Sequence, residues 1–122
     1  EILVEKGCKK VVTTDLCRDD MAEAVEDAFK YGKVVFAASS YDAGLFPPMF
    51  DFIHHLKIKA WQKRDAAIIE NGSWAPSAAR VMKQMLEEMK DITVKGDTVT
   101  LRGVMKQEDL PQLEALADAI LQ

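Results

Sequence analysis

The sequence predicts an α/β fold built on a doubly wound parallel sheet, and two observations lead to that class. Short runs of β-branched or apolar residues alternate with longer amphipathic segments, so the elements are ordered strand, helix, strand, helix along the chain. The runs Val34–Ala38 and Ala66–Ile69 are apolar throughout, which is typical of strands buried on both faces of a sheet. Parallel strands need right-handed crossovers, and we therefore expect helices on both faces, in three α/β/α layers.

The composition limits the classes of protein that the chain can represent. With 122 residues, of which 48% are hydrophobic and 30% charged, the chain is long enough for one globular domain over residues 1–122. The net charge is -4, with acidic and basic residues interspersed, which argues against nucleic acid or an anionic membrane as the main partner. No apolar run approaches the roughly 18 residues of a membrane span.

The cysteines and histidines suggest a cytoplasmic protein without a metal site of its own. Cys8 and Cys17 match no zinc-binding spacing, and residues 1–6 lack the basic start and cleavage site of a secretion signal. We therefore expect reduced thiols in the cytoplasm. His54 and His55 are adjacent, so on a helix they point about 100° apart and do not easily share a metal ion.

Residues 1–38 are expected to form a helix end, a strand, a helix and a second strand. Glu1–Lys6 has some strand propensity, but Gly7 suits the position just past a helix end, so we favour the tail of a helix. Lys10–Thr14 is rich in β-branched residues and predicts a strand. Asp20 can cap a helix with an apolar face, and Lys33–Ala38 is the strand that follows.

The rest of the chain is expected to contain three helices and at least one further buried strand. Pro47 or Pro48 fits the first turn of a helix that runs to about Lys59. Arg64–Ile69 is the third strand, and Pro76 starts the next helix. A final helix follows with an apolar stripe, and Asp109 is expected to cap it.

Two short β-branched segments precede the final helix and leave two interpretations open. Ile92–Val94 and Thr98–Leu101 flank the turn-forming residues 95–97. They could pair with each other as a hairpin, or the first could lead into one last strand of the sheet.

Two loops, each following a buried strand, are the candidate ligand site. The first carries Ser39, Ser40, Tyr41, Asp42 and Gly44, and the second carries Asn71, Gly72, Ser73 and Trp74. Ligands of open α/β sheets bind at the carboxyl ends of the strands, and successive parallel strands would place these loops side by side. Backbone N–H groups there favour an electron-rich ring edge or a carboxylate, and the Tyr and Trp could stack on a flat ring. Alternatively, the Trp packs on a neighbouring helix and the Asn-Gly pair is a plain turn.

Three segments together resemble the flavodoxin-like domain of the flavodiiron proteins, also called A-type flavoproteins. They are Asp15–Phe29, Ser39–Met49 and Ile69–Pro76, and the resemblance covers nearly the whole chain from about Cys8 onward. It implies a flavodoxin-like fold. In that family the domain holds FMN non-covalently and is fused to a metallo-β-lactamase-like domain whose diiron centre reduces O2 or NO.

The resemblance also implies a role for the two loops. Their residues would hold the flavin ring, and the chain would be an electron-transfer domain with no catalytic residue of its own. Electrons would come from a donor such as rubredoxin or a reductase and pass to the diiron domain of the parent protein. Diiron chemistry would belong only to that separate domain.

The sequence departs from the family at its beginning. In the flavodoxin strand order 2-1-3-4-5, the first strand is central, and a loop rich in Ser and Thr after it holds the FMN phosphate. The chain starts late in the first helix, so we expect an N-terminally truncated fragment of a larger flavodiiron-type protein. Lys10–Thr14 would then lack its normal neighbour, so that another segment or another chain fills the place, or the first residues pack irregularly. FMN binding is expected to be weak or lost, because the charge-assisted bonds to the phosphate are missing.

A different class of function stays open at this point. A flavodoxin-like module without flavin could act through protein contacts, with Tyr41, Leu45, Phe46 and Trp74 exposed as an interface. A flavin or quinone reductase is a further reading, but it needs a nicotinamide site that the sequence does not reveal.

Overall fold

The computed structural model of the protein describes residues 2–41, 44–72, 77–102 and 106–122. Five α-helices and five strands lie in these parts of the chain. The helices are α1 (Ile2–Glu5), α2 (Met21–Lys30), α3 (Pro47–Ile58), α4 (Ala78–Glu87) and α5 (Leu110–Leu121), the last preceded by a 3-10 turn, η1 (Gln107–Asp109). The strands are β1 (Lys33–Tyr41), β2 (Gly44–Leu45), β3 (Arg64–Asn71), β4 (Ile92–Val94) and β5 (Val99–Leu101).

The sheet is mainly parallel, as the sequence predicted. Its order is β2-β1-β3-β4, and β5 also pairs with β3. β1 and β3 pair in parallel from Lys33 opposite Asp65 to Ser39 opposite Asn71, and only the two-residue β2 is antiparallel, to β1. The α/β class is therefore confirmed.

β4 and β5 lie one after the other along the same edge of β3. β4 pairs with the start of β3, with Ala66 opposite Val94, and β5 pairs with its end, with Ile69 opposite Val99. Both pairings are parallel, so the hairpin interpretation is wrong and the interpretation of a short segment leading into a last strand is right. Four residues, 95–98, span the distance of two on β3, so the strand is interrupted there. The Lys95 N–H still donates to the Ala66 carbonyl at 2.7 Å, and the bulge away from β3 therefore begins after Lys95.

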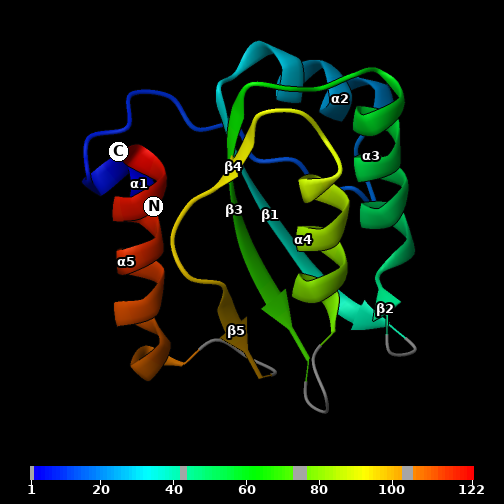
Figure 1. The fold of residues 1–122 in the computed structure, drawn as a ribbon. Coiled ribbons are helices and arrows are strands. Elements are labelled where there is room, and N and C mark those ends of the chain that lie inside the picture. The colour runs from blue at the N-terminus through cyan, green and yellow to red at the C-terminus, as the bar shows by residue number, and fades with distance from the viewer. Residues whose placement is uncertain (1, 42–43, 73–76, 103–105) are drawn as a thin grey trace.

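Helices cover both faces of the sheet (Figure 1). On one face, α2, α3 and α4 bury a large apolar cluster against β1 and β3. On the other face, α5 packs on β3 and β5 with a smaller cluster, and α1 lies beside α5. Side chains alternate between the two clusters, with Ala66 and Ile68 in the first and Ala67 in the second, as expected for a strand with two buried faces. The three-layer α/β/α arrangement is thus confirmed.

The predicted helix ends are confirmed in three places and wrong in one. Asp20 caps α2 by accepting a hydrogen bond from the Ala22 N–H at 3.0 Å, and Pro47 begins α3. Gly7, at φ +98, ends α1 in a Schellman motif, in which the Cys8 N–H reaches the Leu3 carbonyl at 3.0 Å. Asp109 precedes α5 but its carboxylate accepts from the Lys106 N–H, so it closes the 3-10 turn instead of capping the helix.

The predicted strand Lys10–Thr14 is wrong, because these residues belong to no strand or helix. No backbone hydrogen bond to another described residue holds them, and Val11 and Val12 are exposed at 40% and 46%. β-Branched residues favour a strand only where a partner strand and a packed face exist, and here both are lacking. The first residues therefore pack irregularly, which was one of the expected outcomes.

No helix in the parts of the chain that the structure describes is long and apolar enough to cross a bilayer.

Candidate functional site

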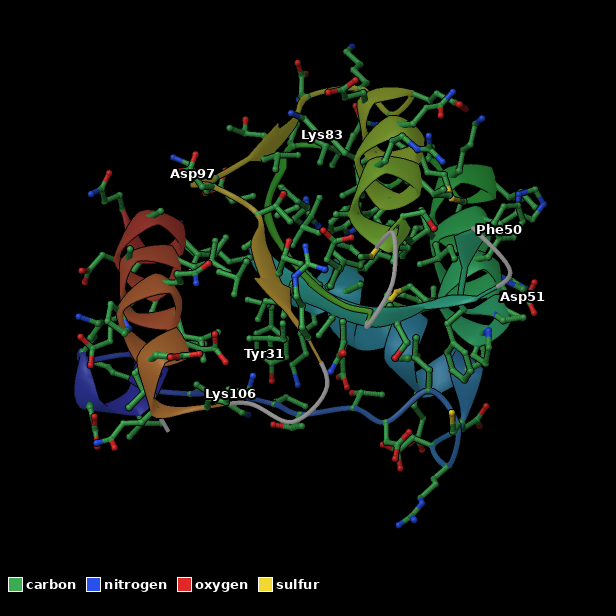
Figure 2. The ribbon with its side chains drawn as sticks, turned by 90° about the horizontal axis from the view of Figure 1, so that it is seen from below. Tyr31, Phe50, Asp51, Lys83, Asp97 and Lys106 are labelled. Carbon is green, nitrogen blue, oxygen red and sulfur yellow. The ribbon has the colours of Figure 1, made fainter. Side chains whose placement is uncertain are left out.

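The carboxyl ends of β1, β3 and β5 meet at one edge of the sheet. Ser39 lies opposite Asn71, and Asn71 lies opposite Leu101 on its other side. Figure 2 looks onto this edge from below, with α1 and α5 on one side and α3 and α4 on the other. Neighbouring strands lie about 4.8 Å apart, so the segments that follow them start side by side, as the sequence predicted.

The first predicted loop is in large part a strand and a short hairpin. β1 continues through Ser39 and Ser40 to Tyr41, where the antiparallel β2 begins with Gly44 opposite Tyr41. The Phe46 N–H closes the hairpin by donating to the Ser39 carbonyl at 3.1 Å. Ser39 is exposed at this edge. The strand thus extends three residues beyond the predicted end, because β2 supplies backbone partners that the sequence pattern did not reveal.

One predicted site residue in this hairpin lies outside the described residues, namely Asp42.

The second predicted loop begins later than expected. Glu70 and Asn71 are the last residues of β3, and Gly72 follows directly. The Gly72 N–H donates to the Leu101 carbonyl at 3.0 Å, so this amide is already used within the sheet. Asn71 is half-buried and has a side-chain amide that can donate and accept. Ser73 and Trp74, and Pro76 as a helix start, lie outside the described residues.

Glu70 is a residue of this edge that sequence reasoning did not single out. It is buried, at 8% exposure, and its two carboxylate oxygens accept from the Thr100 hydroxyl at 2.7 Å and the Ala79 N–H at 3.1 Å. Ala79 is the second residue of α4, so the carboxylate stabilises an otherwise unpaired amide of that helix start. The sequence pattern could have identified Glu70. It continues the alternation of Ala66 and Ile68 on one buried face of β3, and a charged residue at such a position needs hydrogen-bond partners.

One of the four residues that were expected to be exposed as a protein-interaction surface is buried. Leu45 is buried, at 8% exposure, and belongs to the apolar cluster under α3 and α4, while Phe46 is only half-exposed. Leu45 is therefore part of the core and not available for a partner protein.

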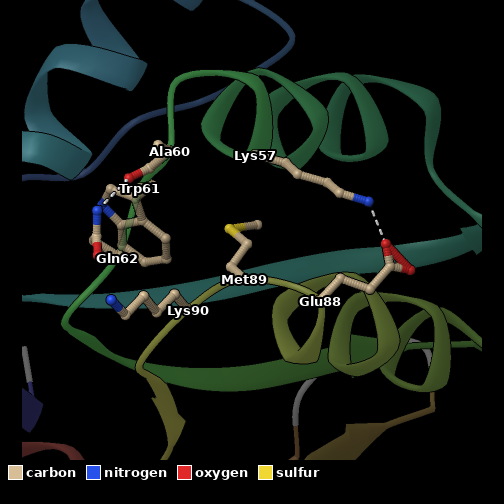
Figure 3. Close-up of a pocket in the computed structure, with 7 residues that line it drawn as sticks. All are labelled: Lys57, Ala60, Trp61, Gln62, Glu88, Met89 and Lys90. Carbon is tan, nitrogen blue, oxygen red and sulfur yellow. Dashed lines mark hydrogen bonds and ion pairs between the residues drawn. The ribbon is translucent and has the colours of Figure 1, made fainter.

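A pocket lies at the end of the sheet opposite to the candidate site. It is a cavity of about 360 Å³ before the amino ends of β3 and β4, lined by Lys57, Ala60, Trp61, Gln62, Glu88, Met89 and Lys90. Figure 3 shows Lys57 and Glu88 joined as an ion pair over it, on α3 and just after α4. Trp61 is 1% exposed and donates from Nε1 to the Ala28 carbonyl at 2.9 Å, so its indole is a core group. No group of three potential metal-ligating side chains occurs among the described residues.

The donors at the carboxyl edge fit the ring edge of a flavin. That edge carries amide-like carbonyl and N–H groups without charge, and it needs short polar partners that can donate and accept. The exposed Ser39 hydroxyl and the Asn71 amide provide such groups from adjacent strands. The two rest on strands that are tied together by a seven-residue parallel ladder, so the edge is pre-formed.

The comparison with solved structures decides the fold. The rubredoxin oxygen:oxidoreductase of Desulfovibrio gigas matches 98% of this chain with a TM-score of 0.89 and 17% sequence identity. Oxidised flavodoxin 1 from Bacillus cereus matches 98% of the chain with a TM-score of 0.81 and 12% identity. The chain has a flavodoxin-like fold. The resemblance inferred from the three loop segments is therefore confirmed at the level of the fold.

The chain covers a small share of the oxygen:oxidoreductase and of a flavo di-iron protein, but most of the flavodoxin. The chain spans 30% of the Desulfovibrio enzyme and also 30% of a flavo di-iron protein from Thermotoga maritima, which it matches at 24% identity and a TM-score of 0.78. It spans 82% of the Bacillus flavodoxin. Searches with family models and among curated proteins found no match.

Proposed function

We propose that this chain is the FMN-binding, electron-transfer domain of a flavodiiron-type oxidoreductase. The observation that carries the proposal is the pairing of Ser39 with Asn71 at the carboxyl edge of a flavodoxin-like sheet. Ligands of open α/β sheets bind at this edge. The high structural similarity to a rubredoxin oxygen:oxidoreductase and to a flavo di-iron protein supports the choice of parent class.

The chain's own residues would bind and orient the flavin. Ser39 and Asn71 would hydrogen-bond to the ring edge, together with the backbone of Ser40 and Gly44 and the side chains of Asp42 and Ser73. Tyr41 and Trp74 would stack on the ring and keep water from its faces. Gly72 would contribute close approach rather than a donor, since its amide is already bonded. When bound, FMN supplies reversible electron transfer.

The partners follow from the same proposal. A rubredoxin-like protein or a reductase would deliver electrons, and a diiron domain of the parent protein would receive them. Residues 1–122 would then be one domain of a longer protein. The free thiols of Cys8 and Cys17 are in keeping with a cytoplasmic location.

A titration with flavin, in which the fluorescence of each tryptophan is followed separately, tests the proposal. The chain has two tryptophans, and Trp61 is buried before the amino end of β3, remote from the candidate site. Trp61→Phe leaves Trp74 as the reporter, and Trp74→Phe leaves Trp61 as the matched control. Binding should be weak, as the missing phosphate loop predicts, but at high FMN concentration the emission of the first variant should be quenched much more than that of the second. Riboflavin should bind about as well as FMN if no phosphate loop contributes.

Two outcomes would contradict the proposal. Equal quenching of both variants would mean that flavin does not bind at the carboxyl edge. Absence of quenching, also in a chain extended upstream by its natural preceding residues, would favour the flavin-free interaction module.

A further inference from the structure

Asn71 and Gly72 form a dipeptide that is chemically labile in flexible chains. Asn71 is the only asparagine in the sequence. In an Asn-Gly pair the glycine nitrogen can attack the asparagine side-chain carbonyl, because glycine has no Cβ to hinder the approach and its backbone turns freely. Asp-Gly pairs undergo the same cyclisation, and the sequence contains none. This dipeptide is therefore the one place in the chain where spontaneous deamidation is expected to be fast.

The reaction needs no oxidant, reductant or enzyme. The Gly72 nitrogen gives up its proton to water or hydroxide and bonds to Cγ of Asn71, and the side-chain nitrogen leaves as ammonia. The product is a cyclic imide. Water then opens the ring at either of its carbonyls, which gives aspartate, or isoaspartate with an additional carbon in the main chain.

The fold opposes the first step in two ways. The Gly72 N–H donates to the Leu101 carbonyl at 3.0 Å, so the attacking nitrogen keeps its proton and points away from the side chain of Asn71. Asn71 lies between Ser39 on β1 and Leu101 on β5 in two parallel pairings, which hold its backbone extended. Ring closure requires rotation of this backbone. The dipeptide is therefore unreactive while both pairings are intact.

The bond to Gly72 depends on β5, which is attached by few contacts. β5 has three residues, and among the described strands it pairs with β3 alone, beyond the interruption after β4 (Figure 1). Val99 is buried in the small cluster beside α5, and the Thr100 hydroxyl donates to Glu70 at 2.7 Å. Segments with few buried contacts open locally at a lower free energy than the whole domain. Opening of β5 releases the Gly72 N–H without unfolding the large apolar cluster.

We propose that Asn71-Gly72 is a deamidation site that the folded chain protects, and that detachment of β5 from β3 is the opening that makes it reactive. Deamidation would replace a neutral amide by a carboxylate opposite Ser39, at the carboxyl edge of the sheet. Isoaspartate would also lengthen the main chain where β3 ends. The proposal does not depend on flavin binding.

Mass spectrometry of residues 1–122 tests the protection. The chain is kept at mildly alkaline pH, folded in buffer or unfolded in guanidinium chloride. Exchange of the amide for a carboxyl group raises the mass, and methylation by an isoaspartate methyltransferase counts the isoaspartate. The unfolded chain should deamidate at least tenfold faster than the folded chain, and Asn71→Gln should give neither signal. Equal rates in the two states, or an unfolded chain that keeps its amide, would overturn the proposal.

Two variants identify the opening. Thr100→Val keeps the shape of the side chain but removes its bond to Glu70, so it weakens the attachment of β5. It should speed deamidation of the folded chain at least threefold and leave the rate in guanidinium chloride unchanged. Val25→Ala is the control, because it lowers global stability from α2, in the other apolar cluster. An acceleration by Val25→Ala as large as that by Thr100→Val would mean that global unfolding exposes the site and that β5 does not control it.

Hydrogen exchange followed by NMR tests the same opening without a substitution. The Gly72 amide should exchange at least tenfold faster than the most protected amides of β1, because β5 opens while the pairing of β1 with β3 persists. In Thr100→Val the exchange of Gly72 and the rate of deamidation should rise by the same factor. If Gly72 exchanges only as fast as the whole chain unfolds, β5 does not detach by itself and the proposal is wrong.

Discussion

The Glu70 carboxylate and the Thr100 hydroxyl form a 2.7 Å hydrogen bond that fastens β5 to β3 beneath the candidate site. The two residues lie opposite each other in the parallel pairing, and the other carboxylate oxygen holds the Ala79 N–H at the start of α4. One buried side chain thus joins two strands and a helix at the edge where Asn71 ends β3. Removing the Glu70 carboxylate should therefore lower the stability of the fold and shift the position of Asn71.

Glu70→Ala should lower the free energy of unfolding by about 3 kcal/mol, because it leaves a buried hydroxyl and a helix amide without an acceptor. Glu70→Gln keeps one acceptor oxygen and should cost less, about 1 kcal/mol. Urea unfolding measures both. Glu87→Gln, on the exposed side of α4, is the control and should change stability by under about 0.5 kcal/mol. A loss for Glu70→Ala no larger than the control's would show that the two bonds do not stabilise the fold.

Gly96 should tolerate no side chain. It has φ +70, and an added Cβ would lie 2.8 Å from the Ala119 Cβ and 3.2 Å from the Leu116 Cδ1 on α5. Gly96→Ala therefore combines backbone strain with overpacking and should cost about 2–4 kcal/mol in thermal or urea unfolding. Gly32→Ala is the matched control, because a Cβ there meets nothing within 4 Å, and its effect should stay within about 1 kcal/mol. Equal effects of the two changes would argue against this packing of residues 95–98 on α5.

The sequence predicted those elements best in which the local pattern and the tertiary surroundings agree. β1 and β3 each contain a continuous apolar run and pair with neighbouring strands, and α2 has both a capping residue in Asp20 and an apolar face. Lys10–Thr14 has the propensity of a strand but no partner, so the prediction failed. The β propensity of a residue reflects how well its side chain fits a sheet, so it favours a strand only where a neighbouring strand is present.

The candidate site was predictable in position but not in detail. That Ser39 and Asn71 end neighbouring strands follows from the order of the elements, and the pairing bears it out. The extension of β1 to Tyr41 depends on pairing with β2, and the use of the Gly72 amide depends on Leu101, which lies 29 positions further along the chain. Both are long-range backbone contacts, which no local pattern reports.

The contact between α1 and α5 should weaken at high pH. Lys6 Nζ lies 2.9 Å from Asp118 Oδ1, and this hydrogen bond, with the nearby acidic charges, raises the pKa of Lys6 above its ordinary value. A raised lysine pKa stabilises the folded state below the ordinary pKa of about 10.4, and this contribution is lost as the pH rises through the higher folded pKa. Asp118→Asn should return the pKa of Lys6 toward its ordinary value and speed hydrogen exchange in α1. Asp51→Asn, an exposed change on α3 at the other side of the molecule, should do neither. A Lys6 pKa that is the same in both variants, followed by NMR, would contradict the assigned cause.

Arg64 should resist even its closest replacement. Its guanidinium donates from Nη2 to the Phe29 carbonyl at 2.9 Å, from Nε to the Tyr31 carbonyl at 3.2 Å and from Nη1 to the Gln62 carbonyl at 2.7 Å. The planar fork thereby ties the end of α2 to the start of β3. Arg64→Lys keeps the charge but cannot reach three carbonyls at once, so it should lower the free energy of unfolding by about 1–3 kcal/mol.

The matched change Arg80→Lys shows whether the loss of stability comes from the three hydrogen bonds of the Arg64 guanidinium or from replacing an arginine by a lysine in general. Arg80 is exposed on α4, so the same substitution there should alter stability by under about 0.5 kcal/mol. Hydrogen exchange adds a local readout, because the last amides of α2 should exchange faster in Arg64→Lys and not in Arg80→Lys. If Arg64→Lys unfolds at the same urea concentration as the unmodified chain, the positive charge near the helix end is sufficient and the three directed bonds contribute nothing measurable.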